Sequence, residues 1–112
     1  GSAFFALEPE QNAGRVSLHT LLAGDIWLRD TGPIFARGSD LTALQFKFNG
    51  WGEKYVMPGD TMTALGMTSV EQAAVERHDF VLEGGAVDLD GAGRLQTTRQ
   101  CVLNENRQTG WT

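Results

Sequence analysis

The sequence predicts a mixed α/β fold with hairpins, on the basis of three observations. Residues 41–48 alternate apolar and polar side chains, as a half-buried strand does. Residues 60–76 carry apolar side chains without that alternation, which indicates an amphipathic helix. Short apolar runs separated by turn signals follow in residues 79–103. Strands before and after a single helix favour a mixed sheet over strict alternation of strand and helix.

The first half of the chain is expected to contain a strand and then a hairpin. Apolar side chains among polar ones predict a strand over residues 15–22, ending next to the polar segment 25–30. A Thr-Gly-Pro turn at residues 31–33 precedes a short apolar strand over residues 33–37. The sequence RGSD at residues 37–40 is a turn signal, so this strand and residues 41–48 form the hairpin.

The second half begins where NGWG at residues 49–52 ends the strand. Gly66 weakens the helix expected over residues 60–76, because glycine lowers helix propensity. Apolar runs then predict strands, broken at Gly84-Gly85 and turned at residues 90–93; they cover residues 79–82, 86–89 and 95–98. Cys101 is predicted to be a buried strand residue, and the polar residues 104–112 to end without a cap or core element.

Composition narrows the possible partners. The chain has 112 residues, enough for one domain or part of a larger one, and a net charge of −5. No run of Lys or Arg occurs, which argues against nucleic acid as a partner. No apolar run reaches membrane-spanning length, which argues against a membrane protein. The single cysteine excludes an internal disulfide, so a reducing, cytoplasmic location is the expectation.

A polar cluster lies in the sequence DIWLRDTGP at residues 25–33. Apolar residues flank it on both sides, which is how a scaffold presents a binding site. Carboxylates such as Asp25 and Asp30 can bind a planar guanidinium through two parallel hydrogen bonds, and the Trp27 indole adds cation–π attraction. The cluster therefore suggests a cationic guest. The alternative is that Arg29 pairs with one of the acids and Trp27 belongs to the core.

Glu83 precedes two glycines, which let the backbone kink and approach a ligand closely. A Glu at such a kink is a candidate to orient a substrate or another catalytic group. The alternative is a β-bulge that carries a surface Glu.

The sequence offers no metal or cofactor site. His19 and His78 lack the spacing of metal ligands. Asp88-x-Asp90-Gly91 resembles the start of a calcium loop, but Arg99 stands where its last Glu is needed. A lone Cys101 in an apolar setting is typical of packing rather than of a nucleophile.

Four segments resemble, in order, motifs of the agmatine deiminase and bacterial peptidyl-arginine deiminase family; they are residues 25–33, 48–52, 82–93 and 97–107. The resemblance implies the pentein fold, a five-bladed α/β propeller of ββαβ modules around a central substrate site. Residues 1–112 would then form a single partial domain, about one module plus part of a second.

The resemblance also implies a chemistry. Members of the family are guanidino-group hydrolases that convert a guanidinium to a ureido group and release ammonia. A Cys attacks the guanidinium carbon to form a covalent thiouronium, and a His protonates the departing ammonia and then assists the attacking water. Two Asp residues hold the guanidinium, and a Glu works beside the His.

By motif, Asp30 matches the guanidinium-binding Asp, Trp27 a residue of the substrate channel, and Glu83 the Glu that partners the catalytic His. The family's Gly-His-x-Asp motif and the segment with its nucleophilic Cys have no match here, and Cys101 matches a non-catalytic cysteine. We therefore expect a small cationic guanidino compound as the partner and no turnover by this chain alone.

A second hypothesis keeps the fold and changes the function. A short chain derived from a pentein could serve as a non-catalytic binding or assembly module. Its unpaired strand edges and apolar flank would have to be buried against another molecule, so this hypothesis predicts a homo-oligomer.

Overall fold

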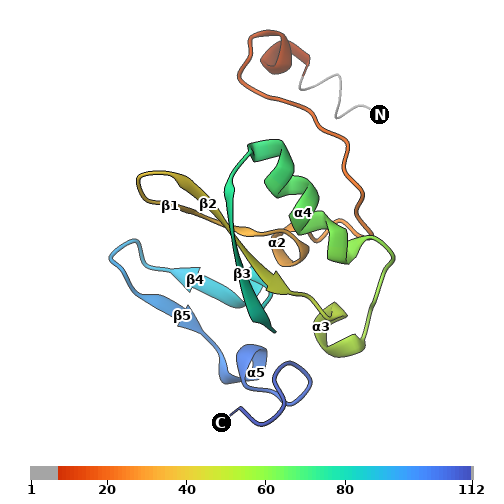
Figure 1. Cartoon of the computed structure of the whole chain (residues 1–112), viewed down its shortest axis with the longest axis vertical. Coiled ribbons are helices and arrows are strands. Elements are labelled where there is room, and N and C mark those ends of the chain that lie inside the picture. The colour runs from red at the N-terminus through yellow and green to blue at the C-terminus, as the bar shows by residue number, and fades with distance from the viewer. Residues whose placement is uncertain (1–7, 112) are drawn as a thin grey trace.

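A three-stranded mixed sheet forms the centre of the molecule in the computed structural model, which describes residues 8–111. Strand β1 (Ile34–Arg37) pairs antiparallel with β2 (Leu41–Lys47), and β2 pairs parallel with β3 (Ala74–Val81). Helix α4 (Asp60–Glu71) connects β2 to β3 and lies beside the sheet (Figure 1). The order strand, strand, helix, strand confirms the predicted mixed α/β architecture with its hairpin.

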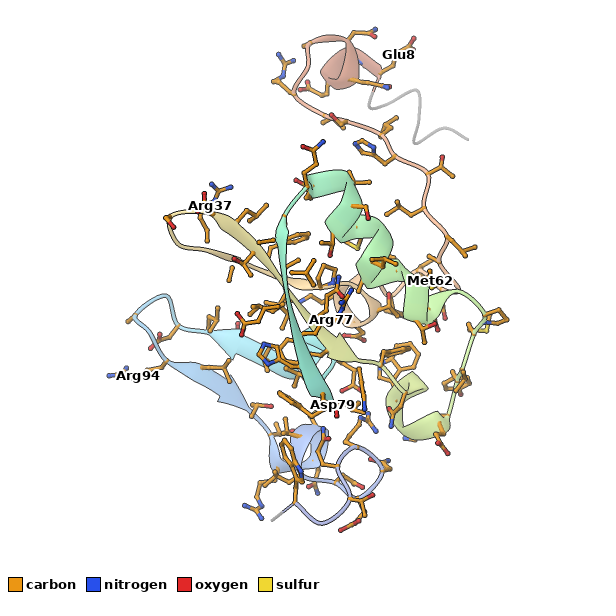
Figure 2. All side chains as sticks on the ribbon, viewed as in Figure 1. Glu8, Arg37, Met62, Arg77, Asp79 and Arg94 are labelled. Atoms are coloured by element: carbon orange, nitrogen blue, oxygen red, sulfur yellow. The ribbon has the colours of Figure 1, made fainter. Side chains whose placement is uncertain are left out.

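A second, two-stranded sheet follows, made of β4 (Val87–Leu89) and β5 (Leu95–Thr97). Asp90 closes its turn, because one carboxylate oxygen accepts the backbone N–H groups of Ala92 and Arg94 at 2.7 and 3.0 Å. The Arg94 backbone N–H is the main reason that the pKa of Asp90 lies below its usual value. Arg94 lies near the tip of this hairpin, as Arg37 does in the β1–β2 hairpin (Figure 2).

The core is small. In residues 8–111 the buried hydrophobic side chains are those of Ala43 and Val81, which are 0% and 9% exposed. Leu89 and Leu95 of the second sheet remain 67% and 60% exposed. Between residues 8 and 111, no helix is long and apolar enough to cross a membrane, and no three His, Cys, Asp or Glu side chains gather as a metal site would require.

The strand predicted over residues 15–22 is wrong. Residues 16–23 have no regular secondary structure, and part of this segment runs along α4. Leu21 packs there, with a side-chain carbon 3.4 Å from the position that a Cβ on Gly66 would occupy. Gly66 thus gives Leu21 room on the helix surface, and contact with the helix replaces the strand pairing that alternation suggested. Residues 28–31, which include the end of the polar segment that follows, form a short helix.

The predicted helix is correct at its start and too long at its end. It stops at Glu71, where Gln72 adopts the left-handed conformation with φ of +51°. Residues counted toward the helix, such as Ala74 and Val75, instead begin β3 and pair with Thr42 and Ala43 of β2. The parallel ladder therefore overrides the helix propensity of this stretch.

The C-terminal part also differs from expectation. Cys101 lies in a short helix, α5 (Arg99–Val102), which the Thr98 side chain caps, and not in a strand. Gln108 is 6% exposed and exchanges hydrogen bonds with both backbone groups of Val81 at the end of β3. The polar segment thus extends the packing of the sheet instead of ending in solvent.

The connection from β2 to α4 contains a left-handed turn, α3 (Gly50–Glu53). Its four residues have positive φ, +66° at Gly50, +57° at Trp51, +82° at Gly52 and +63° at Glu53. A residue with a Cβ is disfavoured there by about 1–2 kcal/mol. Trp51 and Glu53 keep this conformation because the surroundings impose it, and such enforced strain is typical of functional sites.

Gly50→Ala tests how tightly this turn is held. A Cβ at Gly50 would lie 2.3 Å from the Tyr55 carbonyl oxygen, whereas nothing lies within 4 Å of one at Gly91, which has a similar φ of +72°. Gly91→Ala is therefore the control for conformational strain alone, with an expected loss of about 1 kcal/mol in the free energy of unfolding. Gly50→Ala should lose about 2–4 kcal/mol in urea unfolding. Equal losses of unfolding free energy in the two variants would show that the turn moves to accommodate the added Cβ at Gly50.

Candidate functional site

The polar cluster identified in the sequence forms one turn of helix. Helix α2 (Leu28–Thr31) begins directly after Trp27, whose carbonyl oxygen accepts the Thr31 N–H at 3.1 Å and the Thr31 hydroxyl at 3.2 Å. Thr31 is 4% exposed and anchors this turn in the molecule. The anchored turn fixes the positions of Trp27 and Asp30, whose side chains line a common pocket.

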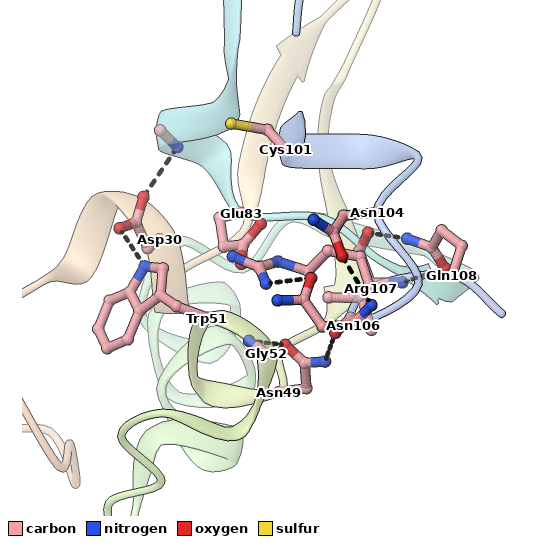
Figure 3. A network of polar contacts seen from close by, with 12 residues as sticks. Asp30, Asn49, Trp51, Gly52, Glu83, Cys101, Asn104, Asn106, Arg107 and Gln108 are labelled. Atoms are coloured by element: carbon pink, nitrogen blue, oxygen red, sulfur yellow. Dashed lines mark hydrogen bonds and ion pairs between the residues drawn. The ribbon is translucent and has the colours of Figure 1, made fainter. Parts of the chain in front are cut away.

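Asp30 joins three segments that are distant in the sequence (Figure 3). One carboxylate oxygen, Oδ2, accepts the Trp51 indole Nε1–H at 3.0 Å, and Oδ1 accepts the Gly85 backbone N–H at 2.9 Å. A Cβ at Gly85 would lie 2.3 Å from Oδ1, and one at Gly84 would lie 2.3 Å from the Arg29 carbonyl oxygen. The two glycines are therefore required for the close approach of this segment to α2.

These two hydrogen bonds leave the Asp30 carboxylate with capacity for more. An ionised carboxylate offers about four lone-pair sites, and the described contacts use two of them. The remaining sites suit a planar donor with parallel N–H groups, such as a guanidinium. The indole and amide donors hold the carboxylate in one orientation before any ligand arrives.

The space in front of Asp30 is a pocket of about 330 Å³. Its lining consists of three aromatic side chains, one carboxylate and one ammonium group: Trp27, Trp51, Tyr55, Asp30 and Lys54. Trp27 and Tyr55 are 55% and 68% exposed, so their rings are available to a ligand. Aromatic faces around a carboxylate attract a flat cation through cation–π contacts and hydrogen bonds together.

The structure contradicts the alternative interpretation of this cluster. Arg29 makes no ion pair with Asp25 or Asp30 within residues 8–111, and the exposed Trp27 is not a core residue. Asp25 also departs from the prediction, because it does not line the pocket and accepts the N–H of its neighbour Ile26 at 2.6 Å. Of the two acids, Asp30 alone faces the cavity.

Glu83 is buried at 3% exposure, which rules out the alternative of a surface Glu on a β-bulge. Its Oε1 accepts the Arg107 Nε–H at 2.6 Å, and the two side chains are 4% and 12% exposed. Removing one partner of such a buried pair costs about 3–5 kcal/mol, because an uncompensated charge remains. The pair therefore locks Glu83 two residues before the Gly85 N–H that binds Asp30.

A chain of hydrogen bonds links this ion pair to the left-handed turn (Figure 3). Arg107 Nη1 donates to the Asn106 side chain at 3.0 Å, and the Asn106 carbonyl oxygen accepts the Asn49 Nδ2–H at 2.8 Å. The Asn49 side-chain oxygen in turn accepts the Gly52 N–H at 2.9 Å. The C-terminal loop thus supports the turn that presents Trp51 to Asp30.

Sequence reasoning placed Trp27, Asp30 and Glu83 in a site but gave no role to Trp51, Lys54, Tyr55 or Arg107. The signal for Trp51 was its position between two glycines, because such flanks allow a residue to be held in an unusual backbone conformation. No local pattern indicates that Arg107 pairs with Glu83 across 24 positions. The functional roles assigned to Trp27, Asp30 and Glu83 by resemblance stay predictions.

Trp51→Phe tests the indole hydrogen bond. Phe keeps an aromatic ring but removes the donor, leaving a half-buried carboxylate oxygen without its partner, so the free energy of unfolding should fall by about 1.5–3 kcal/mol. Trp27→Phe is the matched control, because the exposed Trp27 indole N–H has no acceptor within residues 8–111, and its loss should be near 0.5 kcal/mol. Urea unfolding followed by circular dichroism gives both values. Similar losses would contradict the role of the indole N–H.

Comparison with known proteins places this geometry in a family. Residues 3–112 match the family described as Porphyromonas-type peptidyl-arginine deiminase. An agmatine deiminase of Pseudomonas aeruginosa is 36% identical over 102 residues, which are 84% of this chain and 28% of that protein. The chain thus spans less than a third of the length of this curated relative.

Solved structures of agmatine deiminases resemble this chain as well. A cysteine-to-serine variant of C. jejuni agmatine deiminase with substrate bound is 32% identical, with a TM-score of 0.73 over 92% of this chain and 32% of that one. Agmatine deiminase of Enterococcus faecalis is 31% identical, with a TM-score of 0.74 over 87% of this chain and 30% of that one. With the sequence match over residues 3–112, these similarities show that the chain belongs to the agmatine and peptidyl-arginine deiminase family.

Proposed function

We propose that this chain is the guanidinium-binding segment of a guanidino-group hydrolase of the agmatine or peptidyl-arginine deiminase type. The observation that carries the proposal is the Asp30 carboxylate, held by Trp51 and Gly85 and facing a pocket with aromatic walls. The membership of the family supports a small guanidino compound as the ligand. The C. jejuni relative was solved with its substrate bound, which adds to this support.

Asp30 contributes orientation as well as charge. Because its two oxygens are fixed by donors from different segments, the carboxylate need not reorganise when a guanidinium binds. Two parallel hydrogen bonds would set the plane of the guanidinium and so aim its carbon at a nucleophile. Trp27, beside the carboxylate, is proposed to line the path of the substrate.

Glu83 is the proposed catalytic contribution of this segment. In the proposed reaction a cysteine thiolate adds to the guanidinium carbon, and the C–N bond breaks as a proton is delivered to the departing nitrogen, which leaves as ammonia. Water then adds to the thiouronium carbon and the C–S bond breaks, which gives the ureido product and returns the cysteine. Glu83 would hold the histidine that moves these protons, with Arg107 fixing the orientation of the carboxylate. We propose that the thiol and the imidazole come from outside these 112 residues.

The arrangement of the elements supports a proposal about the complete fold. Strands β1 and β2, helix α4 and strand β3 form one ββαβ unit, and the β4–β5 hairpin has the form of the beginning of a second. We propose that such units continue into an α/β propeller around the substrate site. A cytoplasmic location, suggested by the lone Cys101, stays a prediction.

Titration with methylguanidine and agmatine, followed by isothermal calorimetry, tests this function. One carboxylate with aromatic walls offers few contacts, so we expect a Kd of about 1 mM. Asp30→Asn should weaken binding at least tenfold. The negative charge is lost, and the NH2 group of the amide cannot accept a hydrogen bond from the guanidinium. Asp25→Asn changes the net charge equally, but Asp25 precedes α2 and lies outside the pocket, so binding should be unchanged. Equal effects of both variants, or no binding, would overturn the proposal.

A second function is favoured by one specific observation. A hollow of about 860 Å³ with an apolar lining lies between the main sheet and the β4–β5 hairpin, and the exposed Leu89 and Leu95 belong to it. An apolar surface of this kind invites association with a second copy of the chain. The chain would then act as a non-catalytic, self-associating module.

Light scattering across a concentration series separates this second function from the first. Self-association predicts a mass that rises with concentration and falls back to the monomer in Leu89→Glu, because a charge there opposes burial of the hollow. Glu71→Gln, on an exposed residue outside the hollow, should leave the mass unchanged. A constant monomer mass would exclude the assembly function.

A further inference from the structure

We propose that Lys54 selects guanidino compounds that carry a carboxylate at their other end, over those that end in an ammonium group. The proposal rests on the proposed function of the Asp30 pocket and names its substrate class. It assigns a specificity role to a residue that no motif singled out. The pocket lining carries it, because Asp30 and Lys54 are the two charged side chains among its five residues and have opposite signs.

The position of Lys54 is set by the same turn that sets Trp51. Its backbone N–H donates to the Gly50 carbonyl oxygen at 2.9 Å, directly after the left-handed residues of α3. Trp51 donates to Asp30, so one turn connects the carboxylate that binds a cation with the ammonium group at the same pocket. The backbone position of Lys54 beside the Asp30 pocket is therefore set by the fold.

Lys54 is available to a ligand. Within residues 8–111 it makes no ion pair, in contrast to Lys47, which pairs with Asp79 on the surface. Its ammonium group is therefore not held by a carboxylate of the described residues. A charged group left open at the rim of a pocket acts on a ligand through attraction for one sign and repulsion for the other.

The two classes of ligand differ in what they present to Lys54. Arginine-like compounds carry a guanidinium at one end and a carboxylate at the other. The guanidinium is opposite in charge to Asp30, and the carboxylate is opposite in charge to Lys54. Agmatine ends in an ammonium group, which repels the lysine. An exposed ion pair changes the affinity for one ligand by about fivefold at most. The ratio of the two affinities changes by more, because Lys54 attracts the carboxylate of one ligand and repels the ammonium group of the other. We therefore expect N-acetylarginine to bind about tenfold more tightly than agmatine.

The test compares four ligands by calorimetry on the full chain: methylguanidine, N-acetylarginine, N-acetylarginine amide and agmatine. Methylguanidine reports on the Asp30 pocket alone, and the amide differs from N-acetylarginine only by its missing carboxylate. Lys54→Met removes the charge, and Lys54→Glu reverses it. Arg37→Glu is the control, because it shifts the net charge as much as Lys54→Glu but lies near the tip of the β1–β2 hairpin and outside this pocket (Figure 2).

In the wild type we expect N-acetylarginine to bind about fivefold more tightly than its amide. In Lys54→Met the two affinities should become equal, and in Lys54→Glu agmatine should be the tightest of the four ligands. Arg37→Glu should keep the wild-type order. Binding of methylguanidine together with equal affinities for N-acetylarginine and its amide would overturn the role of Lys54 and leave the proposed function standing. Failure of all four ligands to bind would overturn the proposed function, and this inference with it.

Discussion

The Asp30 carboxylate is the constraint on which the site depends. It accepts hydrogen bonds from the Trp51 indole and the Gly85 backbone, so α2, the left-handed turn and the start of the second sheet meet at one charged group. Hydrogen bonds to a charged group are worth more than neutral ones, and both oxygens still have lone pairs to offer. One side chain thereby organises the fold locally and presents the group that a cation would bind.

The strain at this site has a visible support. Trp51 and Glu53 hold left-handed backbone conformations that side chains disfavour, and they alternate with Gly50 and Gly52, which accept this conformation easily. Asn49 and Asn106 brace this turn from one side, and the buried pair of Glu83 with Arg107 holds the C-terminal loop in place. The indole is therefore held by contacts that reach from residue 49 to residue 107, which explains why four separate sequence motifs meet in one region.

The sequence predicted those features that depend on local chemistry. The β1–β2 hairpin, the start of α4 and the turn at Asp90 follow from alternation, glycine and aspartate signals, and the structure has each of them. Features decided by distant partners were missed. Residues 15–22 have the apolar pattern of a strand, but part of this segment packs beside α4. Gln108 is buried and hydrogen-bonded to the Val81 backbone, which lies 27 positions earlier in the sequence. The pocket showed the same division: Trp27 and Asp30 were found from one short motif, whereas Trp51, Lys54 and Tyr55 joined it through the turn.

The most direct measurement is an NMR titration of the chain with methylguanidine, following the tryptophan indole and backbone N–H resonances. The sequence holds three tryptophans, so Trp111, which packs near Phe80 and lies outside the pocket, provides an internal reference. If Asp30 binds the guanidinium, the Trp51 indole N–H and the Gly85 amide should shift together and saturate with one Kd, while the Trp111 indole stays unchanged. Unchanged Trp51 and Gly85 signals, or equal shifts of all three indoles, would contradict the account.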